Sequence, residues 1–501
     1  MKIAYLTCVY PPYPGGIGVL AQGMATEMTK RGHEVEVFTP DTKQRSKVAV
    51  SQPVDALATT RGARREYASG LACSASRLRV SSDGVVVRPK DETGLRQRYE
   101  QPQRQPCTVH QLKPWFRYGN AAFLPQVVRM LKGFDIVHLL YPFFGVAELA
   151  PLIKWRSRGR LVVHHTMDPD APGLLGKFFV AHASFLMPAI FKRADLIITL
   201  SEDFFQGSSL TDVYQEFDQA PPIAFIPNGV DTDLFRPRET VSVSQPVDAS
   251  ATTRGARREY ASGLAYSASR LRVSSDGVVV RSKDETVEPQ RYEQLQRQRQ
   301  QLPVILFVGG LDRAHYFKGL HILVEALKIL QWGGIHFRCA IVGEGDMRKE
   351  YESHAKELGL LEGAPVPSAQ HPRVTLAPGT VQFTGFVAHE QLPRYYQQAA
   401  VCVVPSTEAV ENFSIVAAEA QACGIPVVVS DFPGVRTTVE DAVTGLIVRP
   451  GDPEDLAHTL FAVLEDHGRA KKMGQAGRKR AERLYSWKVV GDKLEEAYKS
   501  L

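Results

Sequence analysis

Short apolar runs rich in valine and isoleucine alternate with longer amphipathic runs along most of this chain. The first such unit joins an apolar run at 1–7, a Pro/Gly turn at 11–18, a helical run that ends at Gly32, and an apolar run at 35–40. Apolar runs of this length between turn signals are typical of strands buried on both faces of a parallel sheet. The pattern predicts a strand, glycine loop, helix, strand unit.

This unit recurs in two series along the chain. The apolar runs of the first series are 134–142, 160–169, 194–202 and 222–231, and those of the second are 302–310, 337–343, 381–386, 399–406 and 424–431. A chain of 501 residues has room for two or three domains. Strands that alternate with helices predict the α/β fold class, here with two doubly wound parallel-sheet domains.

Two long segments interrupt the alternation, and they are near copies of each other. Residues 51–105, which begin SQPVDALATTRGARREYASGL, recur at 244–298 with seven differences in 55 positions. The first copy has a formal charge of +4 and the second of +2, so together they account for the net charge of +6. The rest of the chain is formally neutral, which argues against a nucleic-acid partner. Solenoids need at least three stacked repeats, so two separated copies indicate inserted elements.

Composition predicts a globular protein of the cytoplasm. Apolar residues make up 44% of the chain, yet no stretch of about 18 uncharged apolar residues occurs. The N-terminal residues lack the apolar block and cleavage site of a signal peptide. The six cysteines form no CxxC pair and no ligand-like cluster, as expected in a reducing compartment.

The stretch ENFSIVAAEAQACG at 411–424 carries the strongest chemical signal. Glu411 and Glu419 stand eight residues apart, and a small polar residue opens the apolar helical run between two predicted strands. Residues eight apart on a helix lie about 12 Å apart, on nearly the same face. A helix that begins at the carboxyl end of a parallel strand is suited to binding phosphate through its first amides.

This stretch resembles the E-x7-E signature of the group-1 retaining glycosyltransferases of GT-B fold. The run PNGVDTDLFRP at 227–237 and the PGGIG turn also resemble family motifs, and the resemblance covers almost all of the chain outside the repeats. It implies the GT-B architecture, which consists of two Rossmann-like doubly wound domains facing a cleft.

The resemblance also implies a domain plan. Residues 1–237 would form the N-terminal acceptor domain with 51–105 inserted, and 238–302 would link the domains and contain the copy at 244–298. Residues 303–484 would bind the nucleotide sugar, and 485–501 would form a helix that returns to the first domain.

In the family, the first glutamate of the signature faces the donor sugar and the second binds the ribose. Glu411 would therefore hold sugar hydroxyls and Glu419 the ribose hydroxyls. The backbone amides of Phe413 and Ser414 would meet the diphosphate, and Asn412 would complete this donor-binding stretch.

The resemblance assigns further groups around the donor. The amide of Gly16, in the glycine turn, would face the donor phosphate. A histidine at the end of an N-domain strand would hydrogen-bond the donor sugar; we assign His165, with His164 as the alternative because the register of HHT is ambiguous.

Lys318 is the predicted cation for the leaving diphosphate. The family usually has an arginine directly after the glycine of the strand-end FVG, where this chain has Gly310. Arg313 is the nearest replacement and completes the predicted catalytic set of His165, Arg313, Lys318 and Glu411. No DxD-like pair stands in a suitable setting, so we expect no metal and no cofactor beyond the donor itself.

The sequence thus predicts a retaining hexosyltransferase that moves a sugar from a nucleoside diphosphate to a glycan, lipid-linked or small-molecule acceptor. A lipid-linked acceptor would add peripheral association with the inner face of the cell membrane. Two alternatives remain: a catalytically impaired GT-B scaffold, favoured by Gly310 and the insertions, and another GT-B sugar-nucleotide enzyme.

Overall fold

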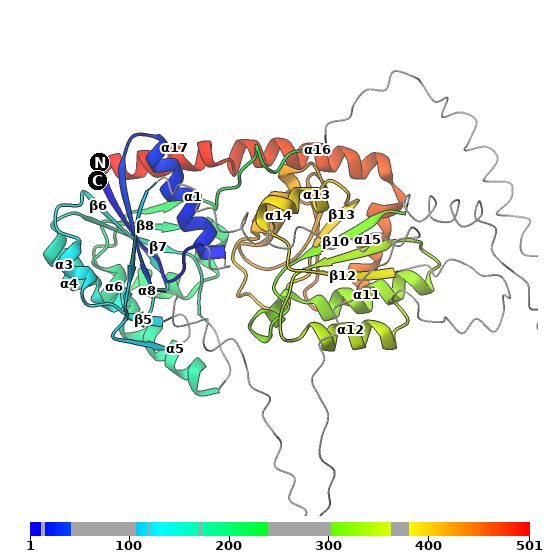
Figure 1. Cartoon of the computed structure of the whole chain (residues 1–501), viewed down its shortest axis with the longest axis horizontal. Coiled ribbons are helices and arrows are strands. Elements are labelled where there is room, and N and C mark those ends of the chain that lie inside the picture. Colours follow the sequence, from blue (N-terminus) through cyan, green and yellow to red (C-terminus); the bar gives the residue numbers. More distant parts are fainter. Residues whose placement is uncertain (12–15, 42–106, 119–120, 170–172, 239–301, 362–379) are drawn as a thin grey trace, which may run out of the picture. The chain divides into compact units, whose positions relative to one another are not determined.

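Two compact units make up the chain in the computed structural model (Figure 1). The first unit comprises residues 1–229 and 490–501, and the second comprises 230–489. The structure describes residues 1–11, 16–41, 107–118, 121–169, 173–238, 302–361 and 380–501. Both predicted insertions, 51–105 and 244–298, lie outside the described residues.

A parallel sheet forms the centre of the first unit. Its described strands number seven and follow the order β3-β2-β1-β6-β7-β8-β9. Their bounds are β1 (Lys2–Leu6), β2 (Glu34–Pro40), β3 (Thr108–Leu112), β6 (Ile136–Tyr141), β7 (Arg160–His165), β8 (Leu196–Thr199) and β9 (Ile223–Phe225). All of them except β3 fall, to within one residue, inside apolar runs that predicted strands, because strands covered on both faces need continuous apolar sequence.

Helices cover the first sheet, and a short antiparallel hairpin lies outside it. The hairpin pairs β4 (Phe116–Tyr118) with β5 (Ala121–Phe123). The helices are α1 (Gly16–Lys30), α3 (Val127–Met130), η2 (Ala147–Leu149), α4 (Ala150–Ser157), α5 (Gly173–Phe185), α6 (Met187–Phe191), α7 (Glu202–Gln206) and α8 (Ser209–Gln215). Ile153 of α4 and Phe191 of α6 share one apolar cluster with Leu139 of β6, so these two helices pack on the same face of the sheet.

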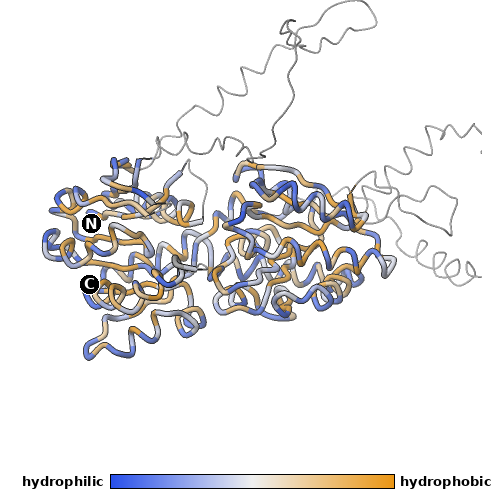
Figure 2. Tube along the Cα trace, turned by 90° about the horizontal axis from the view of Figure 1, so that it is seen from below, coloured by the Kyte–Doolittle hydropathy of each residue, from blue (hydrophilic) through white to orange (hydrophobic). Residues whose placement is uncertain are grey.

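The second unit repeats this plan with six described strands in the parallel order β12-β11-β10-β13-β14-β15. These are β10 (Val304–Val308), β11 (Arg338–Val342), β12 (Thr380–Gly385), β13 (Val401–Val404), β14 (Val427–Ser430) and β15 (Gly445–Val448). The helices are η3 (Arg313–Lys318), α11 (Leu320–Trp332), α12 (Arg348–Glu357), η4 (His389–Gln391), α13 (Leu392–Tyr396), α14 (Ile415–Ala422), η5 (Arg436–Thr438), α15 (Pro453–Glu465) and α16 (His467–Leu484). Apolar stretches alternate with hydrophilic ones along the traces of both units (Figure 2).

The strand order of each sheet reverses direction at one point. In the first sheet the reversal falls between β1 and β6, and in the second between β10 and β13. Loops that leave the carboxyl ends of two such neighbours diverge to opposite faces of the sheet and leave room for a ligand between them. The second reversal matters here because Lys318 and Glu411 lie in the two loops that follow β10 and β13.

The chain passes between the units twice, near Gly229 and near Val489. Residues that follow Gly229 bind to the second unit: Arg478 of α16 donates to the carbonyl oxygens of Thr232 and Phe235 at 2.9 and 2.7 Å. These contacts hold residues 232–235 on the second unit. The final helix, α17 (Trp487–Lys499), contributes its residues from Val490 onward to the first unit.

A buried hydrogen-bonded chain ties α17 to the sheet of the first unit. The Tyr498 hydroxyl lies 2.6 Å from Nδ1 of His138 and 3.0 Å from the Tyr5 hydroxyl, and Nε2 of His138 lies 3.2 Å from Nδ1 of His164. Burial lowers the pKa of His138 well below its ordinary value and that of His164 to about 3. Both imidazoles are therefore neutral, and each hydrogen bond has one donor and one acceptor.

No helix in the described part of the chain is long and apolar enough to cross a membrane.

Removing the Tyr498 hydroxyl should destabilise the first unit. Tyr498→Phe leaves Nδ1 of His138 and the Tyr5 hydroxyl without their shared buried partner, a loss of about 1–3 kcal/mol. We expect the urea midpoint of unfolding to fall accordingly. Tyr395→Phe, which alters a half-buried side chain of the second unit, is the matched control. Equal midpoints for the two variants would contradict this account of the buried chain.

Candidate active site

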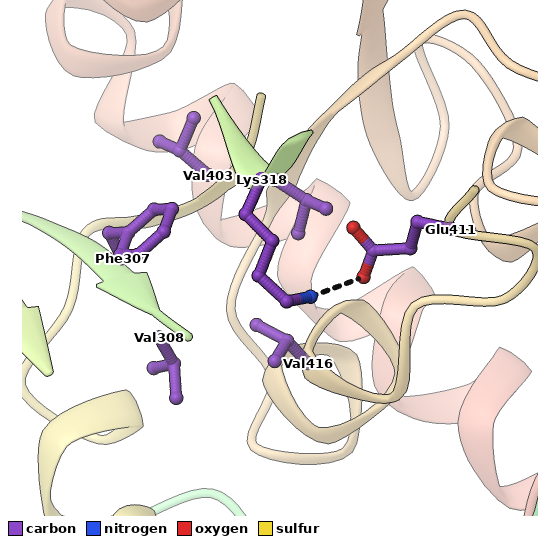
Figure 3. A pocket seen from close by; sticks show the side chains of 7 residues that line it. Phe307, Val308, Lys318, Val403, Glu411 and Val416 are labelled. Carbon is purple, nitrogen blue, oxygen red and sulfur yellow. Dashed lines mark hydrogen bonds and ion pairs between the residues drawn. The ribbon is translucent and has the colours of Figure 1, made fainter. Parts of the chain in front are cut away.

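An ion pair joins the two loops at the strand reversal of the second sheet. Lys318, the last residue of η3, places Nζ 3.1 Å from Oε1 of Glu411, which lies in the loop between β13 and α14 (Figure 3). The two side chains are 20% and 9% exposed, so solvent screens them little. The hydroxyl of Ser406 donates to the other carboxylate oxygen, Oε2.

The pair lies in a small pocket at the carboxyl ends of β10 and β13 (Figure 3). The pocket is lined by Phe307, Val308, Lys318, Val403, Val404, Glu411 and Val416. Its walls are apolar apart from the pair, so the ammonium and carboxylate are the groups available there to a polar ligand.

Gly319 allows the two loops to meet this closely. Its φ of 69° is in the left-handed region, and a Cβ at this position would lie 1.9 Å from the carbonyl oxygen of Pro405. The amide of Thr407 donates to the carbonyl oxygen of Phe317 at 2.7 Å, which joins the same two loops a second time. Any residue other than glycine at position 319 would push the β10 loop, and Lys318 with it, away from the β13 loop.

Helix α14 begins beside the pair. Ser414 is the N-cap residue, with extended backbone, and its hydroxyl accepts from the amide of Ala417 at 3.2 Å. Phe413 is buried edge-to-face against Tyr485, with ring centroids 5.3 Å apart, and Asn412 is buried as well. The first amides of any α-helix have no acceptor within the helix, so this terminus presents partial positive charge near Glu411.

Glu419, in the second turn of α14, is buried and bonded on both oxygens. Its side chain is 4% exposed; Oε1 lies 2.7 Å from Nε2 of His389, and Oε2 accepts from the hydroxyl of Tyr396 at 2.8 Å. An ionised carboxylate has about four acceptor positions, so two remain for ligand hydroxyls. The two partners thus fix the orientation of a carboxylate that retains acceptor capacity.

His389 and Tyr396 were not among the predicted site residues. They lie 30 and 23 residues before Glu419 in the sequence, on η4 and α13, so only the fold reveals the contacts. Burial opposes a charge on His389, but the hydrogen bond to Glu419 and the attraction of nearby carboxylates, including Glu390 and Asp231, raise its pKa above the ordinary value.

Arg313 does not join the pocket. Its side chain is 77% exposed, with Nη2 lying 3.7 Å from Oε1 of Glu350, and its backbone amide donates to Asp346 at 2.9 Å. Of the two cations predicted for the diphosphate, the described structure places Lys318 in the pocket and Arg313 on the solvent side of η3. The role assigned to Arg313 stays a prediction.

Gly16 and the two histidines belong to the first unit. Gly16 is the exposed first residue of α1, directly after the glycine turn. His165 is fully buried at the end of β7, with Nε2 2.8 Å from Oδ1 of Asp168 and its ring stacked on Phe204 at 5.1 Å. His164 points to the opposite face, into the chain that ends on Tyr498. The roles assigned to Gly16 and His165 stay predictions.

Comparison with known proteins identifies the family of this chain. A family model described as "Glycosyl transferases group 1" matches residues 302–466, and one described as "Glycosyltransferase Family 4" matches 14–234. A D-inositol 3-phosphate glycosyltransferase of Xylanimonas cellulosilytica is 31% identical over 385 residues, which cover 73% of this chain and 72% of that protein. The chain belongs to the group 1 glycosyltransferases.

Another relative matches over a shorter stretch, and two solved structures match over the whole chain. An uncharacterized glycosyltransferase of Methanocaldococcus jannaschii is 34% identical over 197 residues, which cover 39% of this chain and 44% of that protein. Among solved structures, sucrose-phosphate synthase of Thermosynechococcus elongatus has a TM-score of 0.58 at 20% identity and covers 100% of this chain and 98% of its own. Anabaena HepE in complex with UDP has a TM-score of 0.59 at 18% identity, with both chains covered fully. These similarities confirm the predicted GT-B fold.

The His389–Glu419 pair should make the stability of the second unit depend on pH. Because the pKa of His389 is raised in the folded protein, the pair contributes fully below about pH 6.5 and loses its contribution as the pH rises through the raised pKa. We expect the difference in melting temperature between wild type and His389→Gln to be larger at pH 6 than at pH 9. His458→Gln, at an exposed histidine of α15, is the control. A difference that stays constant with pH would contradict the charged pair.

Proposed function

We propose that this chain transfers a hexosyl group from a nucleoside diphosphate sugar to an acceptor hydroxyl, with retention of configuration at the anomeric carbon. The observation that carries the proposal is the Lys318–Glu411 pair at the strand reversal of the second sheet, beside the N-terminus of α14. A cation, a helix N-terminus and a carboxylate in one place match a donor that carries a diphosphate next to sugar hydroxyls.

The proposed roles follow from the contacts of each group. Lys318 exchanges its partner Glu411 for the diphosphate and stabilises the charge that develops on the leaving group. The amides of Phe413 and Ser414, with the first turn of α14, add donors to the same anion, and Asn412 supports that loop. The freed carboxylate of Glu411 accepts hydrogen bonds from sugar hydroxyls.

Glu419 would bind the ribose. Its carboxylate is held by His389 and Tyr396 in the second turn of α14, the helix that follows the loop of Glu411. Gly16 and His165 of the first unit retain their proposed roles toward the donor phosphate and donor sugar, and Arg313 retains its proposed role as a second cation.

The pocket is suited to a reaction in which the diphosphate leaves from one face of the sugar and the acceptor oxygen attacks the same face. Among the residues that line it, Glu411 alone carries a carboxylate, and this carboxylate is engaged by Lys318 and Ser406. In the proposed reaction the anomeric C–O bond to the diphosphate breaks, the acceptor oxygen bonds to the same face, and a leaving phosphate oxygen takes the acceptor proton. Lys318 and the amides provide the positive charge, so the proposal includes no metal ion and no cofactor.

The acceptor is proposed from relatives. Since a relative of 31% identity is named a D-inositol 3-phosphate glycosyltransferase, D-inositol 3-phosphate is the first small-molecule acceptor to test. Glycan and lipid-linked acceptors remain within the proposal, and a lipid-linked one would place this cytoplasmic enzyme at the membrane surface. UDP and UDP-glucose are the first donor probes because the HepE fold neighbour has been solved with each.

A nucleotide panel tests the proposal. Melting temperatures are measured with UDP, GDP, ADP and their sugars in EDTA, followed by transfer assays that detect release of the nucleoside diphosphate. One nucleotide class should raise the melting temperature, and Glu419→Ala should abolish the rise.

Lys318→Gln and Glu411→Gln should lower kcat/KM for transfer by roughly 10²–10³, the loss typical of one stabilising contact to transition-state charge. Lys349→Gln and Glu357→Gln, at exposed positions of α12, should match wild type.

Other outcomes separate the alternatives. Binding of a nucleotide sugar followed by its rearrangement, without transfer to any acceptor, would identify another sugar-nucleotide enzyme. Absence of binding for every nucleotide would identify an impaired scaffold. Wild-type transfer by Lys318→Gln would show that the pocket is not the donor site.

A further inference from the structure

The turn that follows β10 contains two consecutive glycines, and a basic side chain covers each of them. A Cβ on Gly309 would lie 2.9 Å from Cδ of Lys318, and a Cβ on Gly310 would lie 2.8 Å from Nδ1 of His315. The stem of Lys318 and the imidazole of His315 therefore each lie against a glycine of the same turn. This turn forms the carboxyl end of the strand that borders the pocket.

Asp312 orients the imidazole of His315. Nδ1 of His315 lies 2.8 Å from each carboxylate oxygen of Asp312, and a carboxylate can only accept, so Nδ1 carries the proton. The remaining polar atom of the ring is Nε2. The ring can donate from Nε2 only when both ring nitrogens carry a proton, and His315 is 45% exposed, so a ligand can reach this atom.

The backbone here is held in a fixed shape. His315 has φ −108° and ψ 16°, a sparsely populated conformation that interrupts η3. The preceding loop is fastened to the loop after β11: the amide of Leu311 donates to the carbonyl oxygen of Glu344 at 3.0 Å, and the amide of Arg313 donates to Asp346 at 2.9 Å. These hydrogen bonds hold the loop in the conformation that places the imidazole against Gly310.

Charge balance at the pocket calls for a second cation. A bound nucleoside diphosphate sugar carries about two negative charges on its diphosphate, whereas Lys318 brings one positive charge and is already paired with Glu411. Arg313, the other cation proposed for the diphosphate, has Nη2 3.7 Å from Oε1 of Glu350 in this structure, so His315 is considered as a group in addition to it.

We propose that His315, oriented by Asp312, is a catalytic residue that contacts the donor diphosphate next to Lys318. The inference rests on the proposed function and adds a residue to the same site. As the anomeric bond to the diphosphate breaks, the electron pair moves to the phosphate oxygen, and the charged Nε2–H donates a hydrogen bond to that diphosphate without giving up its proton. Asp312 is a positioning residue, since it acts through the imidazole.

The test compares nucleoside diphosphates with monophosphates on the full chain. Affinities for UDP, GDP and ADP, each beside its monophosphate, are measured for wild type and for His315→Gln, His315→Arg, Asp312→Asn and the control His458→Gln. His315→Gln should weaken diphosphate binding about tenfold, the order of one charge-assisted hydrogen bond, and leave monophosphate binding within about twofold. His315→Arg restores a charge and should stay within about threefold of wild type, and Asp312→Asn should lie in between.

The outcomes separate this inference from the proposed function. If wild type binds no nucleotide, both are wrong. If wild type binds a diphosphate and His315→Gln binds it equally well, His315 has no contact with the diphosphate and only this inference falls. Equal loss for monophosphate and diphosphate, with no recovery in His315→Arg, would show a purely structural histidine and would also overturn it.

Discussion

Two loops approach each other closely at the point where the strand order of the second sheet reverses, and this approach builds the site. Parallel strands that wind in opposite directions from this point send their loops to opposite faces, which leaves an opening between β10 and β13. Gly319 brings the β10 loop against the carbonyl oxygen of Pro405, so the two loops meet at this opening. Lys318 and Glu411 pair across the contact because no larger residue at 319 separates them.

The ion pair itself is better suited to exchange than to stability. Burying two charges costs desolvation free energy that their mutual attraction offsets only in part. A buried ion pair is therefore weak evidence of a stabilising role. A ligand that carries both a diphosphate and hydroxyls offers each member a replacement partner. Glu419 differs, since Tyr396 and His389 hold it in place before any ligand arrives. Glu411 is thus paired with an ammonium and a serine hydroxyl, and Glu419 with an imidazole and a tyrosine hydroxyl.

Much of this arrangement could be predicted from the sequence, for a physical reason. Strands buried on both faces need unbroken apolar runs, so β1, β10 and β13 were predictable, whereas the edge strand β3, with the mixed sequence TVHQL, was not. Lys318 and Glu411 follow predicted strands, and the ends of parallel strands share one edge of a sheet. Partners far apart in sequence, such as His389 and Glu419, become visible only once the fold brings them together. The solvent-facing direction of Arg313 depends on loop geometry that the pattern of residues does not encode.

A crystal structure of the full chain with a nucleoside diphosphate would test whether the pocket at the β10–β13 reversal binds the donor. We predict phosphate oxygens within hydrogen-bond distance of Nζ of Lys318 in place of Glu411, and ribose hydroxyls on the carboxylate of Glu419. A nucleotide bound elsewhere, with the Lys318–Glu411 pair intact, would contradict the account.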